Sequence, residues 1–340
     1  MVKIEEDILA QIEIEESHLK QEKQSRSLEF MPVQLFAIIM GLSGLTIVYA
    51  KAYHLLGLPY WIYGTLLLLD TLLFVVIFTA YMFKILLHTQ AVLKELNHPI
   101  KSSFMAAISI SFLLLSIAYY DFAPSVSILL WSIGTPLQLI FTLVVIKYWI
   151  HNDLEVVHSN PAWFIPIVGN ILIPVVGVDA APLYISIFFF SIGLFFWIVL
   201  FTVMMNRIIF HHQLAKKLVP TFFIFMAPPA VAFISYFKIT NGSIDMFSMF
   251  LYFIALFILL LLLFMVRMYD TKEFFISWWA YTFPLAAITI ATLMLEMVFH
   301  NSFTFVASWF LILLSSFVVG FVAFKTMLAS RAQIICISEE

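Results

Sequence analysis

The sequence predicts an all-α, polytopic membrane protein with ten transmembrane helices. Its composition supports this class, because 63% of the 340 residues are hydrophobic and only 11% are charged, far from the balance of a soluble domain. About twenty apolar residues are needed to span the hydrocarbon core of a bilayer, and ten such stretches follow one another. Each stretch must be helical, since lipid offers backbone groups no hydrogen-bond partners.

The ten stretches alternate between two kinds. One kind carries proline and small residues, and the stretch that follows it is longer and richer in Leu, Ile, Phe and Val. A pair that recurs along the chain indicates one supersecondary unit used repeatedly, so we expect five pseudo-symmetric helical hairpins. The prolines that mark the five units are Pro32, Pro99, Pro161, Pro220 and Pro284.

Short connections join the ten predicted helices and leave no room for a second domain. We expect an acidic, cytoplasmic N-terminal tail (residues 1–30), a ten-helix transmembrane domain (31–328) and a cytoplasmic C-terminal tail (329–340). The predicted helices are residues 32–52, 60–84, 99–120, 123–149, 160–179, 180–206, 219–239, 244–268, 274–297 and 303–327.

The odd-numbered helices are predicted to form an inner ring around a central pore. Their small residues allow close helix approach or leave a lumen, whereas the bulky aliphatic residues of the even-numbered helices suit lipid. Each internal proline removes one backbone hydrogen bond and bends its helix. A carbonyl freed in this way is tolerated only inside protein or against a water-filled cavity. The expected pore-lining or kink residues are Ala37, Gly41, Gly44, Ala107, Gly169, Pro174, Ala227, Pro228 and Pro284.

Positive charge is distributed unevenly between the two faces of the predicted bundle. All but two of the seventeen Lys and Arg residues lie in the N-terminal tail, in even-to-odd loops such as the one assigned to Lys84, or near the C-terminus. The positive-inside rule therefore predicts that both termini are cytoplasmic. The exceptions, Lys51 and Lys238, fall at the outer ends of helices 1 and 7.

The acidic tail carries Ile4, Ile8 and Ile12 at four-residue intervals, which predicts a short amphipathic helix. Such a helix is either a solvated anchor or a cytoplasmic plug or docking element.

Asp70 is unusual because it lies ten residues into the second helix, near the middle of the membrane. An unpaired aspartate at that depth costs about 2.5–3.5 kcal/mol. Two interpretations remain: a hydrogen-bonded link between the rings through a nearby hydroxyl, or an intramembrane acid that couples transport to protons.

Several kinds of chemistry have no signature in this sequence. The single cysteine, Cys336, cannot form an internal disulfide or a thiol cluster, and the histidine spacing matches no metal motif. There is no nucleotide-binding loop and no nucleophile elbow, and no basic patch suggests nucleic acid. We therefore expect no metal, no other cofactor, no nucleic-acid partner and no enzymatic activity.

Four segments resemble a known family. SWWAYTFPLAAITIAT (277–292) resembles the ninth helix of the plant guard-cell slow anion channels, MAPPAVAFISY (226–236) their seventh, PVQLFAIIMGLSG (32–44) their first and HPIKSSF (98–104) the start of their third. The chain is thus similar, over residues 30–328, to the tellurite-resistance/dicarboxylate transporter superfamily, which includes bacterial TehA. The resemblance implies an anion pore within each protomer and a homotrimer in the lipid bilayer. We expect the bilayer to be a bacterial inner (cell) membrane.

The resemblance also implies a gate. In this family a phenylalanine directly before a proline in the ninth helix closes the pore, and the matching residue is Phe283; Phe104 in the third helix is a second candidate. The position of Phe283 agrees with that role, because it lies near the bilayer midplane and precedes Pro284, where the helix bends. A ring there would close the lumen by excluding water.

The leading hypothesis is an anion channel for small monovalent anions such as chloride and nitrate. No Lys or Arg lies in the middle of an inner helix, and an apolar lumen favours anions that dehydrate easily and bind weakly. Lys51 and Lys238 either attract anions to an outer vestibule or are solvated charges at helix ends. The alternative is a proton-coupled carrier of small, malate-like carboxylates, with Asp70 as its proton site, or a carrier of oxyanions such as tellurite.

Overall fold

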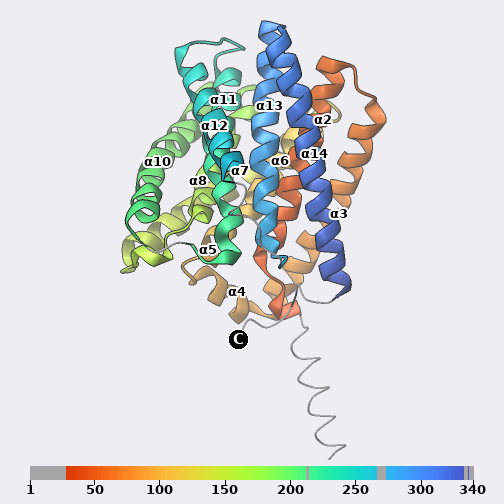
Figure 1. Ribbon diagram of the computed structural model, residues 1–340. Helices are drawn as coiled ribbons and strands as arrows, with labels where there is room; N and C mark the ends of the chain where they lie inside the picture. Colours follow the sequence, from red (N-terminus) through yellow and green to blue (C-terminus); the bar gives the residue numbers. More distant parts are fainter. Residues whose placement is uncertain (1–27, 212–213, 266–272, 333–335, 337–340) are drawn as a thin grey trace, which may run out of the picture.

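The computed structural model describes residues 28–211, 214–265, 273–332 and 336. These residues form a bundle of helices without any strand, so the all-α class is confirmed. Ten of the described helical spans are long and apolar enough to cross a membrane, as the sequence predicts. Figure 1 shows that both ends of the described chain lie at the same end of the bundle, which we call the termini end; the opposite end is the far end.

The five even-numbered spans are single α-helices, whereas the odd-numbered spans are built from shorter pieces. The even-numbered spans are α3 (Tyr60–Leu87), α7 (Pro124–His151), α10 (Leu183–Phe210), α12 (Met246–Phe264) and α14 (Ser302–Arg331). The pieces of the odd-numbered spans are η2 (Val33–Leu35) and α2 (Phe36–Leu56); α5 (Lys101–Phe104) and α6 (Ala106–Tyr119); η4 (Pro161–Phe164), α8 (Ile165–Leu172) and α9 (Pro174–Ala180); η5 (Lys216–Met226) and α11 (Ala227–Ile239); and η7 (Ile276–Tyr281) and α13 (Thr282–Phe299). Short helices η1 (Leu28–Phe30), α4 (Thr89–Leu96) and η3 (Val156–His158) lie between or before the spans.

The two kinds of span differ in burial. Within an apolar window of 18 residues in each span, 67–94% of the residues are buried in the odd-numbered spans, against 28–39% in the even-numbered spans. The buried helices contact one another in a closed cycle, α2–α6–α8–α11–α13 and back to α2, and each even-numbered helix contacts the odd-numbered span that precedes it. The pseudo-symmetry of the five hairpins stays a prediction.

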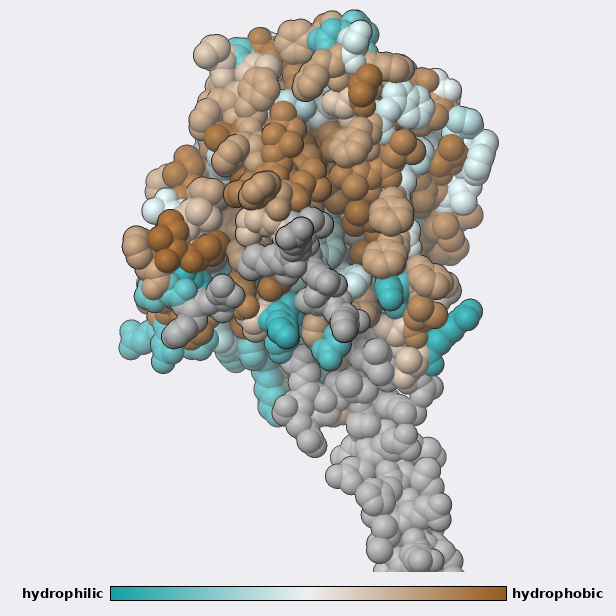
Figure 2. All heavy atoms as spheres, viewed as in Figure 1, coloured by the Kyte–Doolittle hydropathy of each residue, from teal (hydrophilic) through white to brown (hydrophobic). Residues whose placement is uncertain are grey.

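The exposed faces of the even-numbered helices are apolar. Phe257 on α12, for example, is 62% exposed, and many other large apolar side chains on these helices are also exposed. Figure 2 shows hydrophobic residues across the middle of one face of the molecule and hydrophilic residues gathered toward its ends. This distribution suits a surface that contacts lipid between two polar headgroup regions.

Three prolines that the sequence predicts as kink residues lie at the starts of α segments. Pro174 is the first residue of α9, and Pro228 and Pro284 fall in the first turns of α11 and α13, which follow the 3-10 segments η5 and η7. An amide in the first turn of an α-helix has no intrahelical acceptor, so proline there sacrifices no α-helical bond. Near Pro228 and Pro284, where the sequence predicts a bend, the backbone changes from 3-10 to α geometry. The changes lie at the junctions of η5 with α11 and of η7 with α13.

The termini end also differs from the prediction. Lys84, expected at the end of the second helix (60–84) and counted with the charges of the loop that follows, lies inside α3 with a side chain only 1% exposed. Its Nζ donates hydrogen bonds of 2.8 Å to Oε1 of Glu95 on α4 and to the carbonyl oxygen of Met31. Helix α14 continues to Arg331, beyond the predicted end of the tenth helix at residue 327. The amphipathic helix predicted around Ile4, Ile8 and Ile12 lies outside the described residues.

Candidate functional site

Two cavities lie in the interior of the bundle, and each is lined by residues from all five odd-numbered spans. The inner cavity, at the termini end, has a volume of about 660 Å³. The outer cavity, at the far end, has a volume of about 70 Å³. Among the described residues, Phe283 alone belongs to the lining of both cavities. Its ring therefore lies where one cavity ends and the other begins.

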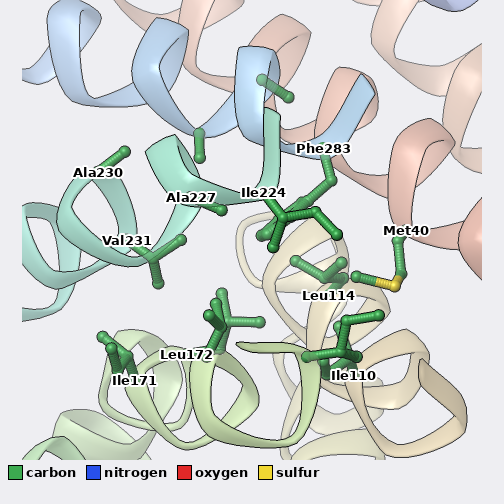
Figure 3. Packing of buried hydrophobic residues seen from close by; sticks show 14 of the residues in the cluster. Met40, Ile110, Leu114, Ile171, Leu172, Ile224, Ala227, Ala230, Val231 and Phe283 are labelled. Atoms are coloured by element: carbon green, nitrogen blue, oxygen red, sulfur yellow. The ribbon is translucent and has the colours of Figure 1, made fainter. Parts of the chain in front are cut away.

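The surroundings of Phe283 are apolar. Figure 3 shows its side chain pointing from α13 toward the same centre as Met40 of α2, Leu114 of α6 and Ile224 of η5. Met40 and Ile224 line the inner cavity, Leu114 lines the outer cavity, and Phe283 is only 6% exposed. A constriction without charged or polar side chains resists wetting, so it blocks ions even when it is not filled completely.

Close packing between α2 and α13 positions the Phe283 ring. A Cβ atom added to Gly44 would lie 2.8 Å from the Cβ atom of Ala286 and 3.5 Å from Cδ2 of Phe283, and one added to Gly41 would lie 2.2 Å from Oγ1 of Thr282. The two helices approach this closely only because positions 41 and 44 have no side chain. The backbone that carries Phe283 is consequently held firmly against α2.

The residues predicted to line a pore fall into two groups. Ala37, Ala227, Pro284 and the second gate candidate, Phe104, line the inner cavity. The other predicted residues line neither cavity: Gly41, Gly44, Ala107, Gly169, Pro174 and Pro228.

The glycines among them face neighbouring helices instead. Gly41 and Gly44 face α13, and a Cβ atom on Gly169 would lie 2.3 Å from the side chain of Gln138 on α7. A small residue suits a helix contact as well as a lumen, and the sequence alone does not separate the two uses. Sequence reasoning conversely missed Met40, Ile110 and Ile224, which line the inner cavity, because large aliphatic residues are also what lipid-facing surfaces carry.

The mouth of the inner cavity is rich in charge. Four lysines and two glutamates contribute to its lining: Lys84, Lys94, Lys101, Lys217, Glu29 and Glu95. Lys84 and Glu95 neutralise each other at 2.8 Å, and Glu95 also accepts a 2.7 Å hydrogen bond from the hydroxyl of Tyr81. Among the described lining residues, Lys94 and Lys217 outnumber Glu29, so this part of the mouth carries a net positive charge.

The outer cavity brings together the two lysines that the sequence places at the far end. Lys51 and Lys238 both line it. Nζ of Lys238 lies 3.2 Å from Oδ2 of Asp179 and 4.8 Å from the centroid of the Tyr120 ring. The Tyr120 hydroxyl donates a 2.6 Å hydrogen bond to the same Oδ2 atom. Burial, followed by this hydrogen bond, raises the pKa of Tyr120, so the hydroxyl remains a donor at neutral pH.

Asp70 has the kind of hydroxyl partner that the first interpretation requires. Oγ of Ser43 on α2 donates a 2.6 Å hydrogen bond to Oδ2 of Asp70 on α3, and both residues are fully buried. Asp70 lines neither cavity, and its Oδ1 atom has no partner among the described residues. The contact links an odd-numbered helix to an even-numbered one, away from the two cavities.

No group of three or more His, Cys, Asp or Glu side chains in the described part of the chain is arranged to hold a metal ion.

The sequence of this chain matches a family model and several known proteins. The model of the voltage-dependent anion channel family matches residues 31–327. The chain is 31% identical to the S-type anion channel SLAH3 of Arabidopsis thaliana, over 85% of this chain and 47% of that protein, and 32% identical to SLAH2 of the same plant, over 77% and 52%. It is 23% identical to the tellurite resistance protein TehA homolog of Haemophilus influenzae, over 87% and 90%. The chain spans about half the length of these two plant relatives.

Proposed function

This chain belongs to the voltage-dependent anion channel family, and from that premise we propose that it is a channel for small monovalent anions such as chloride and nitrate. The resemblance to TehA and the plant slow anion channels, predicted from four segments, is confirmed by the same matches. The observation that supports the channel most is the position of Phe283 between two cavities lined by all five odd-numbered spans.

In the proposed path an anion passes the mouth of the inner cavity, the Phe283 constriction and the outer cavity. Lys94 and Lys217 raise the local anion concentration at the inner mouth. Lys51 does so in the outer cavity, whose lining also includes Asp121, and Lys238 there offsets the negative charge of Asp179. The described residues around the Phe283 constriction include no lysine or arginine that would trap an anion. In the closed state the Phe283 ring keeps water out of the constriction, and displacement of the ring lets water and anions through.

An apolar constriction should select anions by their cost of dehydration. We expect nitrate to permeate at least as well as chloride, and sulfate and divalent carboxylates far less. The test is a set of bi-ionic reversal potentials from the purified protein in planar bilayers. A higher permeability for sulfate than for chloride would mean that a specific binding site, rather than the apolar lining, sets selectivity.

The same recordings test the alternative, a proton-coupled carrier of malate-like carboxylates or of oxyanions such as tellurite. A carrier gives uptake that follows an imposed pH gradient and no resolvable unitary current, whereas a channel gives anion current that reverses at the anion equilibrium potential. The position of Asp70 favours the channel. A carboxyl group that couples transport to protons is expected to line the path of the transported ion, and Asp70 lines neither cavity. We assign Asp70 a structural role, and we assign no catalytic reaction to the protein.

The proposed setting is a homotrimer in a bacterial inner membrane, with a separate pore in each protomer and both termini in the cytoplasm. The biased distribution of Lys and Arg supports the orientation, and the termini end is accordingly the cytoplasmic end. Native mass spectrometry of the protein released from membranes tests the oligomer number. Protease accessibility of a C-terminal tag in sealed vesicles tests the orientation.

A further inference from the structure

The inner cavity is much larger than a channel for chloride or nitrate requires. Its volume of about 660 Å³ falls within the range of about 300–1,000 Å³ that encloses drug-sized ligands. The outer cavity, at about 70 Å³, is roughly a tenth of that size. Phe283 separates the two. A molecule large enough to fill the inner cavity is therefore too large to enter the outer one.

The chemistry of the inner cavity changes with depth. Lys94 and Lys217 at its mouth are exposed, and neither has an ion-pair partner in the described part of the chain. Lys84, in contrast, is neutralised by Glu95. The deeper wall is formed by buried apolar side chains that include Phe104, Ile110, Ile224 and Phe283. The mouth thus suits an acidic head group and the interior suits an apolar body.

We propose that the inner cavity binds amphipathic organic anions, with one acidic group on an aromatic or aliphatic body, and that a bound molecule blocks the pore from the termini end. The head group lies between Lys94 and Lys217. The body lies against the apolar wall, on the side of Phe283 that faces the termini end. Binding itself depends only on the cavity, whereas the block rests on the proposed channel function. The two parts can therefore fail separately.

Naphthalenesulfonate is a suitable probe, because its sulfonate stays ionised and its fused rings match the apolar wall. Calorimetric titration of the purified full-length protein should show saturable binding. The double variant Lys94→Gln/Lys217→Gln should weaken it by about tenfold or more. Lys147→Gln is the matched control, since Lys147 is exposed on α7 and lines neither cavity. Naphthalenemethanol, which has the rings without the charge, should bind far more weakly.

A second variant tests the depth of the site. Ala37 is half-buried on α2 and lines the inner cavity, so Ala37→Leu should fill part of the volume and weaken binding without removing a charge. The proposed site is wrong if naphthalenesulfonate does not bind at about 1 mM, or if it binds equally well to wild type and the lysine double variant.

Recordings from patches with one side accessible test the block. Naphthalenesulfonate applied at the termini end should reduce anion current, and the same concentration at the far end should not. Equal inhibition from both sides would contradict the proposed geometry even if binding is confirmed. Binding that follows the predicted variant pattern in a protein without anion current would support the site and overturn the proposed channel function instead.

Discussion

The hydroxyl of Ser43 on α2 donates a 2.6 Å hydrogen bond to the buried carboxyl group of Asp70 on α3. This contact joins a buried odd-numbered helix to a lipid-facing even-numbered helix at mid-membrane depth. A polar contact between helices in this environment is hard to replace, since lipid supplies no alternative partner.

The first prediction concerns this contact. Asp70→Asn retains an oxygen that can accept the Ser43 hydrogen bond, so the variant should assemble and conduct anions within about twofold of wild type. Ser43→Ala leaves Asp70 without its partner and should lower the free energy of unfolding by about 1–3 kcal/mol. Detergent unfolding curves and anion currents per protein measure the two effects. Wild-type uptake that follows a proton gradient, and loses that dependence in Asp70→Asn, would favour the carrier instead.

The Asp70 contact illustrates which features could be predicted from sequence. A carboxyl group at mid-membrane needs a partner, so the sequence predicted a hydrogen-bonded link as one of two roles, and the structure supplies Ser43. The ten spans and their two kinds were predictable from a similar constraint. Lipid requires a helical backbone and apolar side chains on the surfaces that it contacts. The identity of the partner was not predictable, because it depends on how two helices rotate against each other.

The second prediction concerns the buried ion pair at the termini end. The side chains of Lys84 and Glu95 are 1% and 10% exposed, so removing one charge leaves the other buried without compensation. Lys84→Met should therefore lower the free energy of unfolding by about 3–5 kcal/mol.

The double variant Lys84→Met/Glu95→Gln is the matched comparison for that measurement. Because neither charge then remains, it should recover most of the stability lost in Lys84→Met. Unfolding curves for both single variants and the double variant give the coupling energy. Losses that simply add would show that the pair contributes no interaction of its own.

The third prediction concerns Lys238 in the outer cavity. Lys238→Gln leaves the negative charge of Asp179 without its partner, so it should reduce anion conductance when salt at the far end is dilute. The reduction should shrink as salt is raised, because mobile ions screen that charge. Conductance is measured across a series of chloride concentrations. Lys147→Gln, which changes an exposed lysine away from both cavities, is the control. A reduction that persists unchanged in concentrated salt would indicate a structural effect.

The pore lining was harder to predict than the spans. Ala37, Ala227 and Pro284 do line the inner cavity, but Gly41, Gly44 and Gly169 face neighbouring helices. Small residues serve both purposes, and the difference depends on a helix rotation that composition does not encode. The burial of Lys84 was not predicted, because it depends on an ion pair with Glu95. Glu95 lies on a separate short helix, α4, and its position against α3 cannot be inferred from composition.

The last prediction tests the central claim, that Phe283 closes the pore. Its ring lies between the two cavities, and Phe283→Ala would join them. Widening a dewetted constriction should raise anion conductance steeply without introducing a charge. Phe→Ala at a site that serves only packing typically costs about 3–5 kcal/mol, and would reduce folded protein and current together. The two roles thus predict opposite changes in current per folded protein.

The decisive measurement is anion current normalised to surface protein for wild type, Phe283→Ala and Phe257→Ala. Phe257 is the matched control because its side chain is 62% exposed on α12 and lines neither cavity. We expect a severalfold increase for Phe283→Ala and an unchanged current for Phe257→Ala. A current from correctly assembled Phe283→Ala that stays at or below the wild-type value would show that Phe283 is not the gate.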